Sequence, residues 1–223
     1  CKKREGLMNL CIHRGSKQIG GSCVEIETEG QRILLDLGLP LDAELDETPL
    51  PDVSGLENID ESLLGIAISH AHIDHYGLMA KVRQKVPVVI GKGALRIINA
   101  TRQFFPNTPG FTRTIEIKNE KPIILGPFTI TPYLMDHSAY DAYAYLIEAN
   151  GKKVFYSGDF RSHGRKGKLF EKLLRNPPKD VDVLLMEGTT LSRSGFENKY
   201  LSEDDIKTIF INHFKAANGI TLI

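Results

Sequence analysis

The sequence predicts an α/β protein of the α+β kind, folded as an αββα sandwich in which helices cover the outer faces of two packed sheets. Two observations predict it. Short β-prone runs fall into two groups, one before residue 92 and one from residue 128 onward. Helical patterns accompany both groups, so each sheet has helices that can cover its outer face.

The first group begins with three short β-prone runs, which predict a meander with a hairpin turn at Glu29 and Gly30. An acidic, proline-containing stretch over residues 40–61 is predicted to be a loop. The apolar run "LLGIAI" predicts a strand covered on both faces. The remaining predicted elements are a helix over 76–86, a strand over 87–91, and a helix over 94–105 with Leu95, Ile98, Thr101 and Phe105 at helical spacing.

The second group contains the β-prone runs "FTITPYLM", "AYAYLIEANG" and "KKVFYSGD", with a hairpin turn at Asn150 and Gly151. A helix over 168–176 is expected to end before Pro177, and "VDVLLMEG" predicts a buried strand. Ser202 and Asp205 form a capping-box signature, which predicts a helix over 203–217.

The composition is that of an ordinary soluble globular protein. The chain has 223 residues, of which 41% are apolar and 25% charged, and this length suits one large domain or two small ones. The formal net charge is zero, so a generally basic, nucleic-acid-binding surface is not indicated, although local basic patches are compatible with it. No apolar run approaches the about 18 residues of a membrane span, so no membrane partner is predicted.

The three cysteines, Cys1, Cys11 and Cys23, all lie near the start of the chain and lack CxxC spacing. This pattern argues against a disulfide framework and against a zinc ribbon. Cys11 and Cys23 are expected to be small apolar residues on neighbouring strands, and a reducing, cytoplasmic location fits them.

The two ends of the chain suggest a fragment. The sequence begins with Cys, and it stops where an apolar β-prone segment starts after Gly219. We therefore expect the natural protein to be longer.

Three histidines and an aspartate lie within six residues directly after the apolar run that ends at Ile68: His70, His72, Asp74 and His75. Isolated histidines, such as His13, His163 and His213, are most simply packed or surface residues. Packing gives no reason to place three imidazoles beside a carboxylate, because each buried polar group needs a partner. A solvated histidine-rich loop is the alternative. The strand before the cluster and the helix after it favour a metal site instead.

The spacing within the cluster indicates two metal ions. His70 and His72 suit one tight loop, and Asp74 with His75 then turns away from them. Catalytic metal sites use imidazole and carboxylate ligands and leave one position open. Further ligands are expected at other strand ends, where His137 and Asp159 lie, with Asp136 competing for the role of His137. Alone, Asp159 would be read as a turn aspartate.

The order HxHxDH, then a distant "DHS", then a distant "SGD" resembles the metallo-β-lactamase superfamily over most of the chain. The resemblance implies a metallo-β-lactamase αββα sandwich. It assigns one metal to His70, His72, His137 and Asp159, and the other to Asp74, His75 and a bridging Asp159. It gives Asp36 a supporting hydrogen-bonding role. The last histidine of the second site, which lies late in the family's chains, has no convincing counterpart here.

Three further stretches resemble the β-CASP nucleases, which include the ribonuclease J type enzymes and the messenger-RNA cleavage factors: "IHRGSKQIGGSCVEIE", "HSAYDAYAYLIEANGKKVFYSGDFRSHGRK" and "VDVLLMEGTTLSR". The resemblance makes Glu187 the first β-CASP motif. It implies a metallo-β-lactamase domain over 1–190 and the start of a β-CASP domain over 191–223. As a strand-end acid, Glu187 is alternatively explained by capping the turn that follows.

The function that this resemblance implies is metal-dependent cleavage of phosphodiester bonds in RNA, with DNA as an alternative substrate and a homo-oligomer left open. Two Zn²⁺ ions, or Mn²⁺ or Fe²⁺, would activate a hydroxide, with Asp74 and Glu187 as catalytic residues. Phosphate contacts are expected from Arg161, Arg165 or Lys166, and from Ser138. The rival functions are a thioester or lactone hydrolase of the same superfamily and a non-catalytic RNA-processing scaffold.

Overall fold

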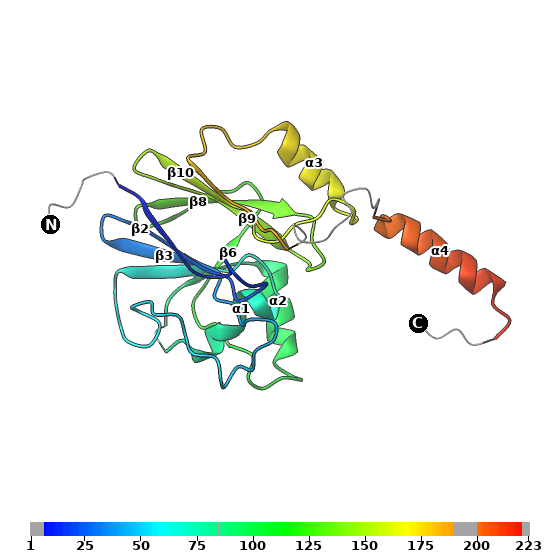
Figure 1. Cartoon of the computed structure of the whole chain (residues 1–223), viewed down its shortest axis with the longest axis horizontal. Coiled ribbons are helices and arrows are strands. Elements are labelled where there is room, and N and C mark those ends of the chain that lie inside the picture. The colour runs from blue at the N-terminus through cyan, green and yellow to red at the C-terminus, as the bar shows by residue number, and fades with distance from the viewer. Residues whose placement is uncertain (1–6, 84, 190–199, 220–223) are drawn as a thin grey trace.

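A computed structural model of the chain describes residues 7–83, 85–189 and 200–219. Two β-sheets pack face to face, with α2 and α3 on their outer faces (Figure 1). The predicted αββα sandwich is confirmed. The first sheet has the order β1-β2-β3-β4-β5-β6 and the second the order β11-β10-β9-β8-β7.

The first sheet takes the chain up to Ile117. Its strands are β1 (Asn9–Arg14), β2 (Cys23–Thr28), β3 (Gln31–Leu35), β4 (Leu63–Ala67), β5 (Val88–Gly91) and β6 (Thr114–Ile117). Strands β1 to β3 pair antiparallel, whereas β3 to β6 pair parallel. Between the parallel strands lie α1 (Ile73–Tyr76), the 3₁₀ helix η1 (Gly77–Lys81) and α2 (Lys92–Thr101).

The second sheet is antiparallel except at its β11 edge. Its strands are β7 (Ile123–Leu125), β8 (Phe128–Met135), β9 (Ala142–Ala149), β10 (Lys152–Tyr156) and β11 (Val183–Leu185). Helix α3 (Gly167–Arg175) separates β10 from β11, and α4 (Glu203–Ala216) follows.

Three hydrophobic clusters separate the four layers. Alternation along a strand sends neighbouring side chains to opposite faces, so Ile33 points between the sheets and Leu34 points toward α2. The cluster between the sheets includes Phe128 and Tyr145, both completely buried. On the far side of the second sheet, Phe155 packs with residues that include Phe170 of α3. This burial fixes where each strand ends, and therefore where the loops between layers emerge.

The helix predicted over 76–86 was wrong in position and type. Helix α1 begins earlier, at Ile73, and becomes the 3₁₀ helix η1 at Gly77. The carbonyl of His75 accepts the backbone N–H of Leu37, and that of Ile73 accepts the N–H of Leu39. These contacts with the chain after β3 compete with a regular helical pattern, and the sequence periodicity alone could not reveal them.

Three further differences lie at the edges of elements. Helix α2 ends at Thr101, and Phe105, expected on its buried face, is 66% exposed. The strand predicted as buried is β11, an edge strand in which Leu184 is 58% exposed. Strands β6 and β7 were not predicted.

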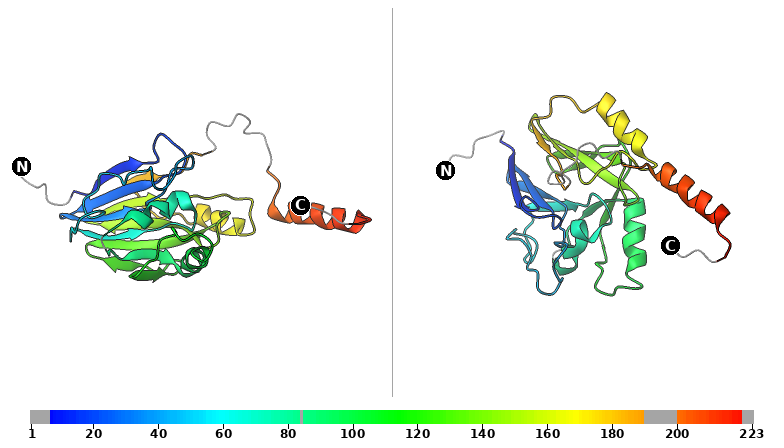
Figure 2. Two further views of the ribbon diagram at one scale, coloured as in Figure 1. Left: turned by 90° about the horizontal axis from the view of Figure 1, so that it is seen from below. Right: turned by 45° about the vertical axis from the view of Figure 1, so that its right-hand side comes forward.

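Helix α4 extends away from the two sheets (Figure 2). Its predicted capping box is confirmed: the Ser202 hydroxyl accepts the Asp205 N–H at 3.1 Å, and the Asp205 carboxylate accepts the Ser202 N–H at 3.0 Å. The β-prone segment expected after Gly219 lies outside the described residues. Within the described ranges, every helix is too short or too polar to span a membrane.

Candidate metal centre

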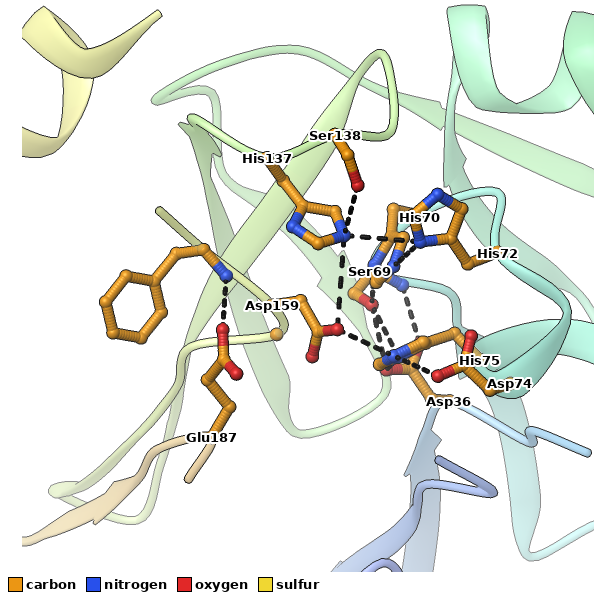
Figure 3. Close-up of polar contacts among 12 residues, drawn as sticks. Asp36, Ser69, His70, His72, Asp74, His75, His137, Ser138, Asp159 and Glu187 are labelled. Atoms are coloured by element: carbon orange, nitrogen blue, oxygen red, sulfur yellow. Dashed lines mark hydrogen bonds and ion pairs between the residues drawn. The ribbon is translucent and has the colours of Figure 1, made fainter. Parts of the chain in front are cut away.

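Loops from both sheets bring the sequence-predicted side chains to one place (Figure 3). The loop after β4 carries His70 and His72, and α1 carries Asp74 and His75. From the second sheet, His137 follows β8 and Asp159 follows β10. The site is therefore built at the ends of three strands, with one sheet facing the other across it.

One group of possible metal ligands consists of His70, His72 and His137, whose ligand atoms all lie within 4.8 Å of one another. Nε2 of His70 is 3.1 Å from Nδ1 of His72, which in turn is 3.2 Å from Nε2 of His137. Two nitrogens bound at about 2.0–2.1 Å to a tetrahedral zinc ion lie roughly 3.3 Å apart. The nitrogens of His70 and His137 thus each lie from His72 at about the spacing that one such ion requires.

A second group consists of His70, His75 and Asp159. Oδ2 of Asp159 is 3.4 Å from Nε2 of His75 and 3.9 Å from Nε2 of His137, so this oxygen of the second group is also close to a histidine of the first. Oδ2 of Asp74 is 3.6 Å from the same His75 nitrogen. Asp74 is next to the second group but is not one of its three members. Both groups fit divalent cations that prefer imidazole and carboxylate ligands.

Asp36 makes hydrogen bonds that hold the loop of His70 and His72 and the ring of His75, as expected. It is completely buried at the end of β3, with a φ of 59°. Its Oδ1 accepts the Ser69 N–H at 2.7 Å. Its Oδ2 accepts the Ser69 hydroxyl at 2.8 Å, the Tyr156 hydroxyl at 2.6 Å and Nδ1 of His75 at 2.7 Å. Because Nδ1 of His75 is thus occupied, its Nε2 is turned toward Asp159 and is free to bind a metal ion.

The charges of the site sort the histidines into two kinds. Burial and the neighbouring imidazoles lower the pKa of His70 well below its usual range. Burial also lowers the pKa of His72. Burial lowers the pKa of His137 to about 4, although the negative charge of Asp159 acts to raise it. For His75, burial disfavours the charged form, but the Asp36 and Asp159 carboxylates outweigh it and raise the pKa well above its usual range. The imidazoles of His70, His72 and His137 are therefore uncharged at neutral pH, and their ring nitrogens can act as metal ligands.

Two close backbone approaches keep the loops together. A Cβ at Gly38 would lie 1.6 Å from the Asp74 carbonyl oxygen, so only glycine fits beneath α1. Gly158, just before Asp159, has a φ of 53°, and a Cβ there would lie 2.9 Å from the Tyr143 carbonyl oxygen.

The sequence of the chain matches the family model described as the beta-lactamase superfamily domain over residues 31–208. The chain belongs to the metallo-β-lactamase superfamily. Its fold agrees with this assignment. The two groups of possible metal ligands, called donor groups below, lie in the segment that the match covers.

Several curated relatives are much longer than the chain. It is 28% identical over 214 residues to a protein named ribonuclease J from Helicobacter pylori strain 26695, covering 92% of this chain and 31% of that protein. It is 28% identical over 198 residues to an RNase J-like protein from Methanocaldococcus jannaschii, covering 81% and 42%. The chain therefore spans less than half of each of these relatives, 31% of the first and 42% of the second.

Solved structures support the fold. A crystal structure of a protein of unknown function from Enterococcus faecalis V583 aligns with a TM-score of 0.76 at 23% identity, covering 92% of this chain and 56% of that one. A metallo-β-lactamase from Cronobacter sakazakii, a HARLDQ motif mutant, aligns with a TM-score of 0.52 at 19% identity, covering 74% and 71%.

Three further candidate residues, Asp136, Glu187 and Ser138, lie near the possible metal ligands and make contacts of their own. The Asp136 carboxylate, a rival to His137, instead accepts the Gly164 N–H at 2.7 Å. Glu187 accepts the Phe160 N–H at 2.8 Å and lies apart from the histidines (Figure 3). The Ser138 hydroxyl is 3.5 Å from His137 and faces the cavity.

Two basic side chains of the loop 160–168 make contacts within the protein. Arg161 pairs with Glu203, and Nζ of Lys166 is buried 5.9 Å from the centre of the Tyr140 ring. Of the isolated histidines, His13 pairs with Glu25 and His163 stacks on Tyr200. His213 lies on the exposed helix α4.

The cysteines are not ligands of the described site. Cys11 and Cys23 lie on the neighbouring strands β1 and β2, as expected. Cys23 is buried, whereas Cys11 is exposed, so only Cys23 is a core residue. Cys1 lies outside the described residues.

An open cavity of about 710 Å³ lies over the donor groups. One wall is the segment 15–20, which includes Lys17 and Gln18, and another is formed by Met186, Glu187 and Thr189. Sequence reasoning missed Lys17, Ser69 and Tyr156. The glycines around "SKQI" were a signal for Lys17, but no sequence signal marked the two hydroxyl partners of Asp36.

Proposed function

We propose that the chain is the metal-holding part of a hydrolase that cleaves phosphodiester bonds in RNA. The observation that carries the proposal is the pair of adjoining donor groups that open into one cavity. In this proposal, His70, His72, His137 and Asp159 hold one zinc ion, and Asp74, His75 and Asp159 hold the other. The names of the relatives support RNA as the substrate.

Divalent ions held by these residues would lower the pKa of a bound water to near neutrality and would neutralise charge on a phosphoryl group. The residues of the chain supply the orientation. Asp36 fixes the ring of His75, and Asp159 faces both groups of imidazoles. Asp74 is beside His75 at the cavity, where it can orient the attacking water.

Substrate contacts are assigned to side chains that line the cavity. Lys17 and Ser138 both line the cavity, where they can bind phosphate oxygens. Glu187 is given a positioning role in place of a catalytic one, because its carboxylate holds the N–H of Phe160, the residue after Asp159. Arg161 and Lys166 are not given a phosphate-binding role, because they are directed into the protein. Arg165 is exposed and stays a proposed phosphate contact.

The domain division is also part of the proposal. Residues 1–190 form the metallo-β-lactamase portion, and residues 191–223 begin a β-CASP domain. Helix α4 supports this division, because it leaves the sandwich with no buried residue of its own. Residues 191–199 and 220–223 lie outside the described ranges.

The test compares RNA with small esters on the natural full-length protein. We expect 5′-labelled RNA to be cleaved, and we expect a chelator or His72→Ala to abolish the cleavage. Intact RNA alongside turnover of thioesters or lactones would replace the proposal with a small-molecule hydrolase. Protein that binds no metal and cleaves neither substrate class would indicate a scaffold. A DNA substrate of the same sequence tests the choice of nucleic acid.

A further inference from the structure

Helix α4 is attached to the metal-site loops through its first residue. The Glu203 carboxylate accepts Nη2 of Arg161 at 2.5 Å through one oxygen and the Arg165 N–H at 2.9 Å through the other. The Glu203 N–H donates to the His163 carbonyl at 3.0 Å. Three contacts thus connect one residue of α4 with the segment 161–165, which begins two residues after Asp159.

The same segment is tied to the loop that carries His137. The Arg161 N–H donates to the Asp136 carbonyl at 2.7 Å, and the Gly164 N–H donates to the Asp136 carboxylate at 2.7 Å. Nε of Arg161 is 3.7 Å from the other Asp136 oxygen. Asp136 is completely buried and directly precedes His137. Arg161 therefore connects Glu203 with both candidate ligands from the second sheet.

The rest of α4 is not buried against the sandwich. None of its residues is buried, and the three contacts of Glu203 attach its first turn to the preceding body. Figure 1 shows α4 pointing outward from the end that is nearest the sandwich. The position of α4 and the geometry of the 161–165 segment thus depend on the same few hydrogen bonds.

We infer that Glu203 is a positioning residue that couples the docking of α4 to metal binding by His137 and Asp159. The inference rests on the proposed metal site and adds to it a connection with the segment beyond residue 200. Coupling is reciprocal, so metal binding also strengthens the attachment of α4. Movement of the proposed second domain, transmitted through α4, would then change the metal affinity of the first.

The test compares Glu203→Gln with Asp204→Asn in the full-length protein. Each variant removes one negative charge from the first turn of α4, so effects on the helix dipole are matched. Asp204 is exposed, and no contact joins its side chain to the basic loop in the described residues. We expect Glu203→Gln to weaken Co²⁺ binding about tenfold, since loss of an outer hydrogen-bond partner typically costs about 10–100-fold.

Hydrogen exchange supplies a readout that does not depend on activity. With Glu203→Gln the amides of Arg165 and Gly164 should exchange faster, and added Co²⁺ should protect the first turn of α4 less than in the wild type. A double-mutant cycle with Arg161→Lys should show non-additive losses of Co²⁺ affinity, because both residues act through one connection.

Equal Co²⁺ affinity and equal exchange in the two single variants would overturn the inference while leaving the metal site intact. A wild-type protein that binds no Co²⁺ would overturn the proposed function and the inference with it. The Co²⁺ absorption spectrum distinguishes these outcomes, because the wild-type bands are present in the first and missing in the second.

Discussion

The two sheets hold their parts of the metal centre in different ways. The loop after β4 rests on Asp36, whose four hydrogen bonds are all buried inside the sandwich. The loops after β8 and β10 are held by Asp136 and Arg161, and through Arg161 by a partly exposed glutamate on α4. The first half of the site is therefore fixed by buried contacts alone, whereas the second half, although Asp136 is buried, also depends on a surface attachment through Arg161.

This difference implies different kinds of sensitivity. Damage to the buried network should affect folding and metal binding together, since an uncompensated buried charge is costly. Damage to the attachment of the second half should change metal affinity with a smaller effect on folding. The following predictions test that distinction.

The largest effect on metal affinity is expected for His72→Ala. Nδ1 of His72 faces both His70 and His137, so its loss opens the first donor group. Direct removal of a ligand should exceed the about 10–100-fold cost of losing an outer partner. Chelator competition measures the affinity, and a circular dichroism spectrum like that of the wild type serves as the folding control. Unchanged affinity would exclude His72 as a ligand.

Asp36→Asn should be the most destabilising of these changes, by about 3 kcal/mol, because one amide cannot accept four donated hydrogens. Metal affinity should fall as well. Denaturant titration of the metal-free protein gives the free energy of unfolding. Tyr156→Phe, which removes a single donor, should cost only about 1 kcal/mol. Equal costs for the two variants would contradict the network.

Asp136→Asn should have a smaller effect on stability, about 1 kcal/mol, since the backbone bond from Arg161 to the Asp136 carbonyl remains. Its effect on metal affinity should be about tenfold. The two measurements used for Asp36→Asn apply here. A loss of stability as large as that of Asp36→Asn would remove the distinction between the halves of the site.

The lowered pKa of His137 contributes stability to the metal-free protein that is lost as the pH falls. The folded-state pKa of His137 is lowered to about 4 from 6.5, so the folded protein resists protonation more than the unfolded chain does. The stability that this difference provides is present above pH 6.5 and is lost between pH 6.5 and about 4. His70 and His72 act in the same direction, whereas the raised pKa of His75 acts in the opposite one. Unfolding measured across this range should show a shallower loss in His137→Asn.

Much of the fold followed from local sequence patterns. Buried strands such as β4 and β8 have strong apolar signals, and their ends located the loops of His70 and His137. The start of α1 was missed because backbone bonds from Leu37 and Leu39 decide it. Partners of the site were harder to predict, since Tyr156 lies 120 residues from Asp36 in the chain and meets it only in the folded sandwich.

Titration of the metal-free full-length protein with Co²⁺, followed by its visible absorption, tests the central claim most directly. Two groups of ligands that share His70, the second of which includes Asp159, should give two binding steps with distinct spectra. In His72→Ala the first step should disappear. A featureless titration at neutral pH, with no bound ion after dialysis, would contradict the assignment of this centre as a metal site.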